Sequence, residues 1–197
     1  LSSKPKNAYC KSKDDVLNTN RETSPQYQLV KLVNDKDVNE MFLTFLSFSN
    51  KTVTNAICDA IEDRNLKVTV IVDSKNLDRP GSTTRNIEKI TNCRPKNLQD
   101  GEQANIPKTM YRGNKGGFGY AHNKIIIANY KSNPEKVKIV YGSGNMSSGA
   151  ILHHENWHFV TTNINSYFVQ AHLCVKEGMI NITDKKSNYK KFINKCR

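Results

Sequence analysis

The chain has 197 residues, of which 30 are Lys or Arg and 18 are Asp or Glu, so its formal net charge is +12 and its pI is about 9.5. This length suits one domain with a short extension and excludes two full-sized domains. The best apolar run, 68–72, is too short to cross a bilayer, so we expect a soluble protein without stable membrane insertion. The positive charge favours a polyanionic partner, either nucleic acid or an acidic membrane surface.

The start of the chain differs in composition from the rest. Residues 1–25 are rich in Lys, Ser and Asn and show no apolar periodicity, so we expect a loosely ordered basic arm followed by a single domain over residues 26–197. The chain begins at Leu1 rather than Met, which favours removal of a leader and a secreted or periplasmic protein. A cytoplasmic location is the alternative.

The cysteines bear on the same question of compartment. The sequence has five of them and no C-x-x-C pair, which argues against a zinc ribbon or a thioredoxin-like site. Bridged cysteines would fit an oxidising compartment, and reduced buried cysteines are an equally strong interpretation. The five are Cys10, Cys58, Cys93, Cys174 and Cys196.

Strand-like and helix-like segments alternate along the chain. Residues 41–48 and 68–73 are compact runs of β-branched and apolar residues, which predicts two strands. Between them, apolar residues recur at helical spacing over 52–64, and 82–93 follow Pro80-Gly81 as a second predicted helix. Further predicted elements are strands at 125–129, 137–141 and 157–162 and a helix at 167–176. The alternation predicts an α/β domain with a mixed, largely parallel β-sheet flanked by helices.

Residues suited to phosphate chemistry gather in the second half of the chain. His122 and Lys124 form H-N-K directly before an apolar strand, so both side chains lie on one face of it. A Gly-Ser-Gly-Asn turn follows at 142–145, and Glu155 follows the turn. Phosphodiester cleavage needs a nucleophile, a cation and neutral donors for the phosphate oxygens, and a carboxylate to orient the imidazole. Any one of these residues alone favours a structural role; their combination favours an active site, with Ser143 and Asn145 as the neutral donors.

This pattern resembles the phospholipase D superfamily, whose motif reads H-x-K-x4-D followed by G-S-x-N and a later Glu. The sequence has His122-Asn-Lys124, then Ser143 and Asn145 within G-S-G-N, then Glu155. The resemblance is to the small single-motif Nuc-type endonucleases and extends over roughly residues 40–178. One position departs, because Asn129 stands where the family has Asp, and an amide forms hydrogen bonds but carries no charge.

The resemblance implies a phospholipase D-like catalytic domain and a metal-independent, two-step reaction without a cofactor. His122 would attack phosphorus to give a phosphohistidine, and water would hydrolyse it. Lys124 and Asn145, supported by Ser143, would hold the phosphate oxygens, and Glu155 would orient His122. Two motifs are needed for a nucleophile and a general acid, and this chain has one. The resemblance therefore implies a homodimer with one composite active site.

A competing motif overlaps this site. Residues 154–158 read H-E-x-x-H, the signature of zinc metalloproteases, in which His154 and His158 would bind zinc, Glu155 would act as base and Glu177 would be a third ligand. The motif requires a helix, whereas residues 157–162 are β-branched and aromatic. A strand is the better prediction here, and the protease is a remote alternative.

Two basic segments are less specific. Residues 112–120 are Gly-rich and fit no nucleotide-binding fingerprint, so a plain loop into the His122 strand is the first interpretation. The second is a substrate-binding rim in which Arg112 and Lys115 meet phosphates and Phe118 or Tyr120 stacks on a base. Gly144 of the G-S-G-N turn is a further substrate-binding candidate. The run 185–197 is either a solvated helix face or a phosphate-tracking surface.

Three functions remain open at this stage. The first is a nuclease that cuts DNA or RNA with little sequence preference, since a charged surface reads backbone rather than bases. The second is a lipid phosphodiesterase of the same superfamily, and the third is an inactive nucleic-acid-binding relative, suggested by Asn129.

Overall fold

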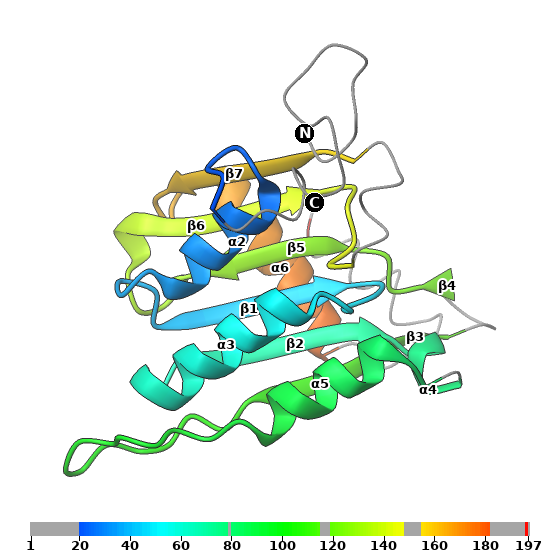
Figure 1. The fold of residues 1–197 in the computed structure, drawn as a ribbon. Coiled ribbons are helices and arrows are strands. Elements are labelled where there is room, and N and C mark those ends of the chain that lie inside the picture. The colour runs from blue at the N-terminus through cyan, green and yellow to red at the C-terminus, as the bar shows by residue number, and fades with distance from the viewer. Residues whose placement is uncertain (1–19, 79, 115–118, 148–154, 182–195, 197) are drawn as a thin grey trace.

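The computed structural model describes residues 20–78, 80–114, 119–147, 155–181 and 196. Within these residues a seven-stranded sheet has the order β4-β3-β2-β1-β5-β6-β7. Helices α2, α3 and α5 lie in front of the sheet in Figure 1, and α6 lies behind it. The molecule is therefore a three-layer α/β domain, as the alternation of elements predicts.

The predicted elements are present, although the strand expected at 41–48 ends at Phe45 and α2, β3 and β4 were not predicted. The helices are α2 (Pro25–Asn34), α3 (Lys51–Arg64), α4 (Lys75–Asp78), α5 (Ser82–Asn92), the 3-10 turn η1 (Pro134–Lys136) and α6 (Tyr167–Asn181). The strands are β1 (Glu40–Phe45), β2 (Lys67–Asp73), β3 (Lys108–Asn114), β4 (Gly119–Tyr120), β5 (Lys124–Ala128), β6 (Val137–Gly142) and β7 (Trp157–Thr162).

The sheet is mixed, but parallel pairing is confined to one half of it. Strand β2 pairs in parallel with β1 and β3, whereas β1–β5, β5–β6, β6–β7 and β3–β4 are antiparallel. The expectation of a largely parallel sheet is therefore wrong in its proportion. The reason lies in the connections: crossover helices join β1 to β2 and β2 to β3, but no helix joins β5 to β6 except the short η1 turn.

Two apolar cores flank the sheet. The larger packs α2, α3 and α5 against alternate residues of β1 and β2, such as Leu43 and Val70. The smaller packs α6 against Phe42, Ile71 and Ile127, which point to the opposite face. Because the side chains of a strand alternate between faces, each central strand contributes to both cores.

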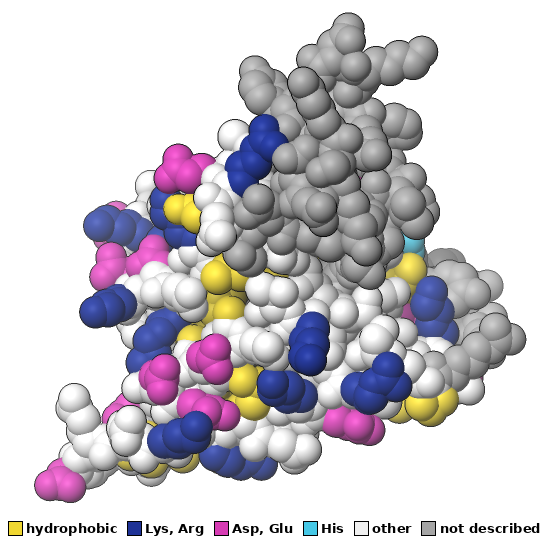
Figure 2. Space-filling view, viewed as in Figure 1, with side chains coloured by type: hydrophobic (Ala, Val, Ile, Leu, Met, Phe, Trp, Pro, Cys, Tyr) yellow, Lys and Arg dark blue, Asp and Glu magenta, His cyan; other side chains and the backbone are white. Residues whose placement is uncertain are grey.

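The charged side chains on the front face are of both signs. Figure 2 shows Lys and Arg interspersed with Asp and Glu over α2, α3 and α5. The described part of this face therefore forms no single basic patch that would serve a polyanion. In addition, none of the helices in the described part of the chain is long and apolar enough to span a bilayer.

Two segments differ from the sequence predictions. Residues 112–114 and 119–120 belong to β3 and β4, so the plain-loop interpretation of 112–120 is wrong at both ends. Pairing of β3 with β2 stabilises a strand that has no apolar alternation of its own. At the other end of the chain, Pro25 opens helix α2, in keeping with the preference of proline for the first helical turn. The expected arm lies mostly outside the described residues.

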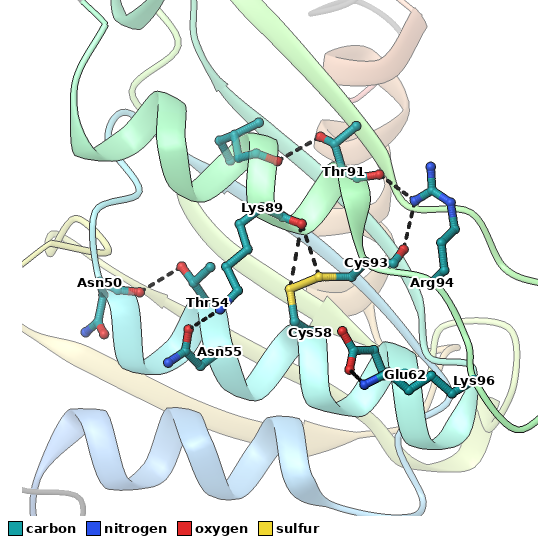
Figure 3. The surroundings of a disulfide bond; sticks show 11 residues. Asn50, Thr54, Asn55, Cys58, Glu62, Lys89, Thr91, Cys93, Arg94 and Lys96 are labelled. Carbon is teal, nitrogen blue, oxygen red and sulfur yellow. Dashed lines mark hydrogen bonds and ion pairs between the residues drawn. A yellow bond between two sulfur atoms is a disulfide. The ribbon is translucent and has the colours of Figure 1, made fainter.

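Two disulfides lie within the described part of the chain. Cys58 of α3 is bonded to Cys93, which follows α5, and their Cα atoms are 5.5 Å apart (Figure 3). An ion pair between Glu62 and Lys96 lies beside this bond, so α3 is joined to the segment that follows α5 both covalently and electrostatically. The second disulfide links Cys174 of α6 to Cys196.

Candidate active site

The topology brings the predicted site residues to one edge of the sheet. Since β5 is antiparallel to β1, and β1 is parallel to β2, the start of β5 lies at the same end of the sheet as the carboxyl ends of β1 and β2. The end of β6 and the start of β7 lie at the same edge. We call this end of the strands the carboxyl edge; it is formed by residues 73–75, 121–124, 142–145 and 155–157. We call the opposite end of the strands, which includes Glu40 and residues 129–132, the amino edge. Ligands of α/β sheets bind at the carboxyl ends of parallel strands.

His122 and Lys124 lie together at the start of β5. The imidazole of His122 is exposed, whereas the Lys124 side chain is only 5% exposed and its Nζ donates to the His122 carbonyl oxygen at 2.7 Å. Burial lowers the pKa of Lys124 to about 8 although Glu155 acts in the opposite direction. Partial burial, followed by the charge of Lys124, also lowers the pKa of His122 from its ordinary 6.5. Near neutral pH the site thus offers a neutral imidazole beside a cation.

Ser143 and Glu155 are joined directly across the β6–β7 pair. The Ser143 hydroxyl donates to Glu155 Oε2 at 2.6 Å and accepts from the Asn156 backbone N–H at 3.1 Å. The Ser143 N–H in turn donates to the Asn156 side-chain oxygen at 3.0 Å. Glu155 is 9% exposed, and its charge favours protonation of His122. These bonds fix the carboxylate close to the imidazole.

Asn145 lies on a turn that hydrogen bonds from residues 49–50 stabilise. The carbonyl oxygen of Met146 accepts from the backbone N–H groups of Ser49 and Asn50 at 2.7 and 3.0 Å, and Met146 is buried. The Asn145 side-chain oxygen is also buried, yet it accepts no hydrogen bond from the described residues. A buried polar atom without a partner is uncommon in a folded protein and is typical of functional sites.

The two glycines of the turn allow β6 and β7 to approach closely. A Cβ atom on Gly144 would lie 2.6 Å from Trp157 Nε1, and one on Gly142 would collide with the Asn156 carbonyl oxygen. Gly144 was predicted to bind substrate. The structure places it in a buried position against the indole ring, where its small size lets Trp157 pack on Phe45.

Two residues at this edge were missed by the sequence analysis. Asp73, at the end of β2, is 1% exposed and its carboxylate accepts from the Ala121 backbone N–H at 2.5 Å. Lys75 opens α4, and its charge lowers the pKa of both His122 and Lys124. No motif marks either residue, because only the parallel pairing of β2 with β1 brings the end of β2 to the same end of the sheet as the start of β5.

Asn129 lies at the amino edge, at the far end of β5 from His122. Its side chain is buried; the Oδ1 atom accepts from the Asn39 N–H at 3.2 Å and from the Ser132 hydroxyl at 3.1 Å. Its Nδ2 donates to the Asp37 carbonyl oxygen at 2.9 Å. Residue 129 also has a positive φ of 63°, a conformation that asparagine tolerates. The variant motif residue therefore connects loops rather than facing the site.

The predicted phosphate-binding rim is described only in part. The Arg112 guanidinium donates to the carbonyl oxygens of Met179 and Ile180, at 2.9 and 2.8 Å. Arg112 thus satisfies carbonyl groups at the end of α6, a role that the sequence did not reveal. Lys115 and Phe118 lie outside the described residues, as does the basic run 185–197 except for Cys196, and nothing is described of the Tyr120 side chain.

The zinc-protease motif has no helix to support it. His158 lies on β7, as the strand prediction requires, and its ring stacks on Tyr141 at a centroid distance of 4.8 Å. Glu177 lies on α6 and pairs with Lys176. His154 is outside the described residues. Among the residues that the structure does describe, no group of three or more His, Cys, Asp or Glu side chains is arranged to hold a metal ion.

The fold matches known structures although the sequence does not match known families. Comparisons with protein-family models and with curated proteins gave no match. The structure is similar to Nuc from Salmonella typhimurium, a phospholipase D family member, with a TM-score of 0.59 and 16% identity over 81% of this chain and 89% of Nuc. It is also similar to NucT from Helicobacter pylori, with a TM-score of 0.57 and 19% identity over 78% of this chain and 86% of NucT. The chain therefore has the phospholipase D fold.

Proposed function

We propose that the protein is a metal-independent phosphodiesterase, and specifically an endonuclease that cuts DNA or RNA with little sequence preference. One observation carries the proposal: separate strands bring His122, Lys124 and the Ser143–Glu155 pair to a single sheet edge. The fold shared with Nuc and NucT and the net charge of +12 support a polyanionic substrate.

The proposed reaction has two displacements at phosphorus. The neutral imidazole of His122 attacks phosphorus, and a P–N bond forms as the bond to the leaving oxygen breaks. A second imidazole donates its proton to that oxygen. Water then attacks the phosphohistidine and gives a proton to the second imidazole, the P–N bond breaks, and a strand ending in a phosphate monoester is released. Lys124 and Asn145 bind the phosphate oxygens as their negative charge grows, and Ser143 supports them through its hydrogen bond to Glu155.

The second imidazole is proposed to come from a second copy of the chain. The chain has one H-x-K motif, and His122 is exposed at the sheet edge. In a homodimer with one composite site, both His122 residues are required. Co-refolding wild type with excess His122→Ala is therefore expected to lower activity as the square of the wild-type fraction. A linear decrease would show that each copy acts alone.

We also propose that the protein is exported to an oxidising compartment. The support is the pair of disulfides, Cys58–Cys93 and Cys174–Cys196, since structural disulfides persist mainly outside reducing cytosol. Thiol titration of the denatured protein purified from its native source tests this: one reactive thiol per chain is expected, and five would contradict it.

The decisive assay offers three substrates in EDTA: plasmid DNA, RNA and anionic phospholipid vesicles. Wild type and His158→Ala are expected to nick plasmid or degrade RNA, whereas His122→Ala is not. His158→Ala is a matched control because it removes an exposed imidazole of β7 and would also inactivate a zinc protease. Headgroup release would instead identify a lipid phosphodiesterase, and DNA binding without turnover would identify an inactive relative.

A further inference from the structure

The buried carboxylate of Asp73 connects two parts of the carboxyl edge. Its Oδ1 atom accepts from the Lys75 backbone N–H at 2.9 Å, and its Oδ2 atom accepts from the Ala121 backbone N–H at 2.5 Å. Ala121 directly precedes His122, and Lys75 is the first residue of α4. The Asp73 side chain, which is only 1% exposed, therefore links the start of α4 to the segment that contains His122.

This connection places like charges close together. The cation of Lys75 lies near enough to His122 and Lys124 to lower the pKa of both. Two neighbouring cations repel each other, so an anion bound near both of them would lower the free energy of this arrangement. Such local conflicts between stability and arrangement are typical of functional sites.

We propose, resting on the function proposed above, that Lys75 binds the substrate phosphate together with Lys124. Asp73 is the positioning residue that holds Lys75 and His122 close together, in the part of the carboxyl edge formed by residues 73–75 and 121–124, which we call the corner. Neither residue belongs to the H-x-K or G-S-x-N motifs. Asp73 acts through the backbone of its neighbours and does not itself contact substrate.

The charges of the corner fit this role. Before substrate binds, Asp73 and Glu155 balance the two lysine cations. A phosphodiester brings one negative charge, and in the transition state negative charge is spread over the equatorial oxygens of phosphorus as the imidazole attacks. Two ammonium groups match that developing charge better than one, so Lys75 is expected to act more strongly on the transition state than on the bound substrate.

The first test compares Lys75→Ala and Lys75→Arg with Lys67→Ala. Lys67 is an exposed residue at the start of β2, and Lys75 follows the other end of that strand. Since both residues are lysines, either substitution lowers the net charge equally. With bis(p-nitrophenyl) phosphate as substrate, we expect Lys75→Ala to lower kcat/KM about ten- to a hundredfold, mainly through kcat. Lys75→Arg should recover most of that loss, and Lys67→Ala should stay within about twofold of wild type. Equal values for Lys75→Ala and Lys67→Ala would overturn the proposal.

The acid limb of the pH profile of kcat/KM separates a positioning role from a merely structural one. The charged groups that act on His122 are Lys124, Lys75, Asp73 and Glu155. Lys75 lowers the pKa of His122 and Asp73 raises it, so the limb should move to higher pH in Lys75→Ala and to lower pH in Asp73→Asn. Lower activity in either variant with an unmoved limb would contradict the assignment. If Asp73→Asn does not fold, the shift of the acid limb in Lys75→Ala alone tests the proposal.

A binding experiment distinguishes failure of this inference from failure of the proposed function. In the His122→Ala background, adding Lys75→Ala should weaken binding to an oligonucleotide and lower the salt slope by about one, whereas adding Lys67→Ala should do neither. If wild type cleaves no phosphodiester, the proposed enzyme is wrong. If wild type is active but the two double variants bind alike, the proposed enzyme stands and the role of Lys75 is wrong.

Discussion

The two edges of the sheet are built from the same strands but differ in how their polar groups are satisfied. At the amino edge, Glu40 Oε1 accepts from the backbone N–H groups of Lys131 and Ser132, and Asn129 uses both its oxygen and its amide nitrogen. At the carboxyl edge, Lys124 is a buried cation beside another cation, and the Asn145 oxygen has no donor among the described residues. The amino edge is completed by its own hydrogen bonds. At the carboxyl edge the neighbouring cations suit an anion, whereas the Asn145 oxygen can only accept a hydrogen bond from a donor.

This difference explains the departure at Asn129. The H-x-K-x4-D pattern runs along β5, and the five residues from Lys124 to Asn129 span roughly 16 Å of strand. The motif therefore has a chemical end at the carboxyl edge and an anchoring end at the amino edge. Asn129, which stands where the motif that this sequence resembles has Asp, therefore lies at the anchoring end and away from the proposed chemistry. This position supports the proposed active enzyme over an inactive relative.

The largest expected effect is at the chemical end. His122→Ala should lower phosphodiester cleavage by at least about a thousandfold because it removes the proposed nucleophile. Its thermal unfolding should match wild type, because the His122 ring is exposed. Cleavage rates and calorimetry measure the two properties. Retained activity in this variant would contradict the assignment of the chemistry to the carboxyl edge.

The second-largest expected effect is a loss of stability caused by a change at the anchoring end. Asn129→Asp removes the donor to the Asp37 carbonyl oxygen and buries a charge, so it should cost about 2–4 kcal/mol of unfolding free energy. Activity per folded molecule should remain that of wild type. Denaturant unfolding and active-site titration measure these quantities, with the exposed Asn97→Asp as control. A rise in specific activity would mean that residue 129 acts in the chemistry.

A smaller effect tests the turn that carries Ser143 and Asn145. In Gly144→Ala the new methyl group meets the Trp157 indole, so we expect a loss of about 1–3 kcal/mol together with lower kcat. Gly101→Ala is the control: it has open space but a positive φ of 81°, so it should cost stability without changing kcat. Equal kcat values in the two variants would show that the turn does not position the site.

The smallest effect concerns pH. Because the pKa of Lys124 is about 8, the cation is lost as pH rises through that value. In the His122→Ala background, affinity for an oligonucleotide should therefore decline between about pH 7 and 9. Lys124→Arg in the same background should show no such decline, since guanidinium stays charged. Fluorescence anisotropy measures both affinities, and parallel pH curves would contradict the assignment of Lys124 to phosphate binding.

The local pattern of apolar residues predicted most of the helices and strands. The elements that it did not predict include one that depends on pairing with a strand distant in the sequence. Strands at 68–73, 125–129, 137–141 and 157–162 and the helix over 52–64 were predicted from apolar periodicity and are confirmed. Helix α2 was missed, although Leu29, Leu32 and Val33 have helical spacing and are buried. Strand β3 carries no such signal, because its stability comes from pairing with β2.

The site divides in the same way. His122, Lys124 and the 142–145 turn were found because they lie close in sequence and fit one motif. Asp73 and Lys75 were not, because about fifty residues separate them from His122 and only the β2 crossover brings them near. The cysteine pairing was equally inaccessible: Cys58–Cys93 depends on how α3 and α5 pack.

The stereochemistry at phosphorus tests the central claim most directly. An oligonucleotide with one phosphorothioate linkage of known configuration is cleaved in heavy-oxygen water, and the product configuration is determined. Each in-line displacement inverts phosphorus, so a phosphohistidine on His122 predicts overall retention. Inversion would mean that water attacks the phosphodiester directly, which would contradict His122 as the nucleophile.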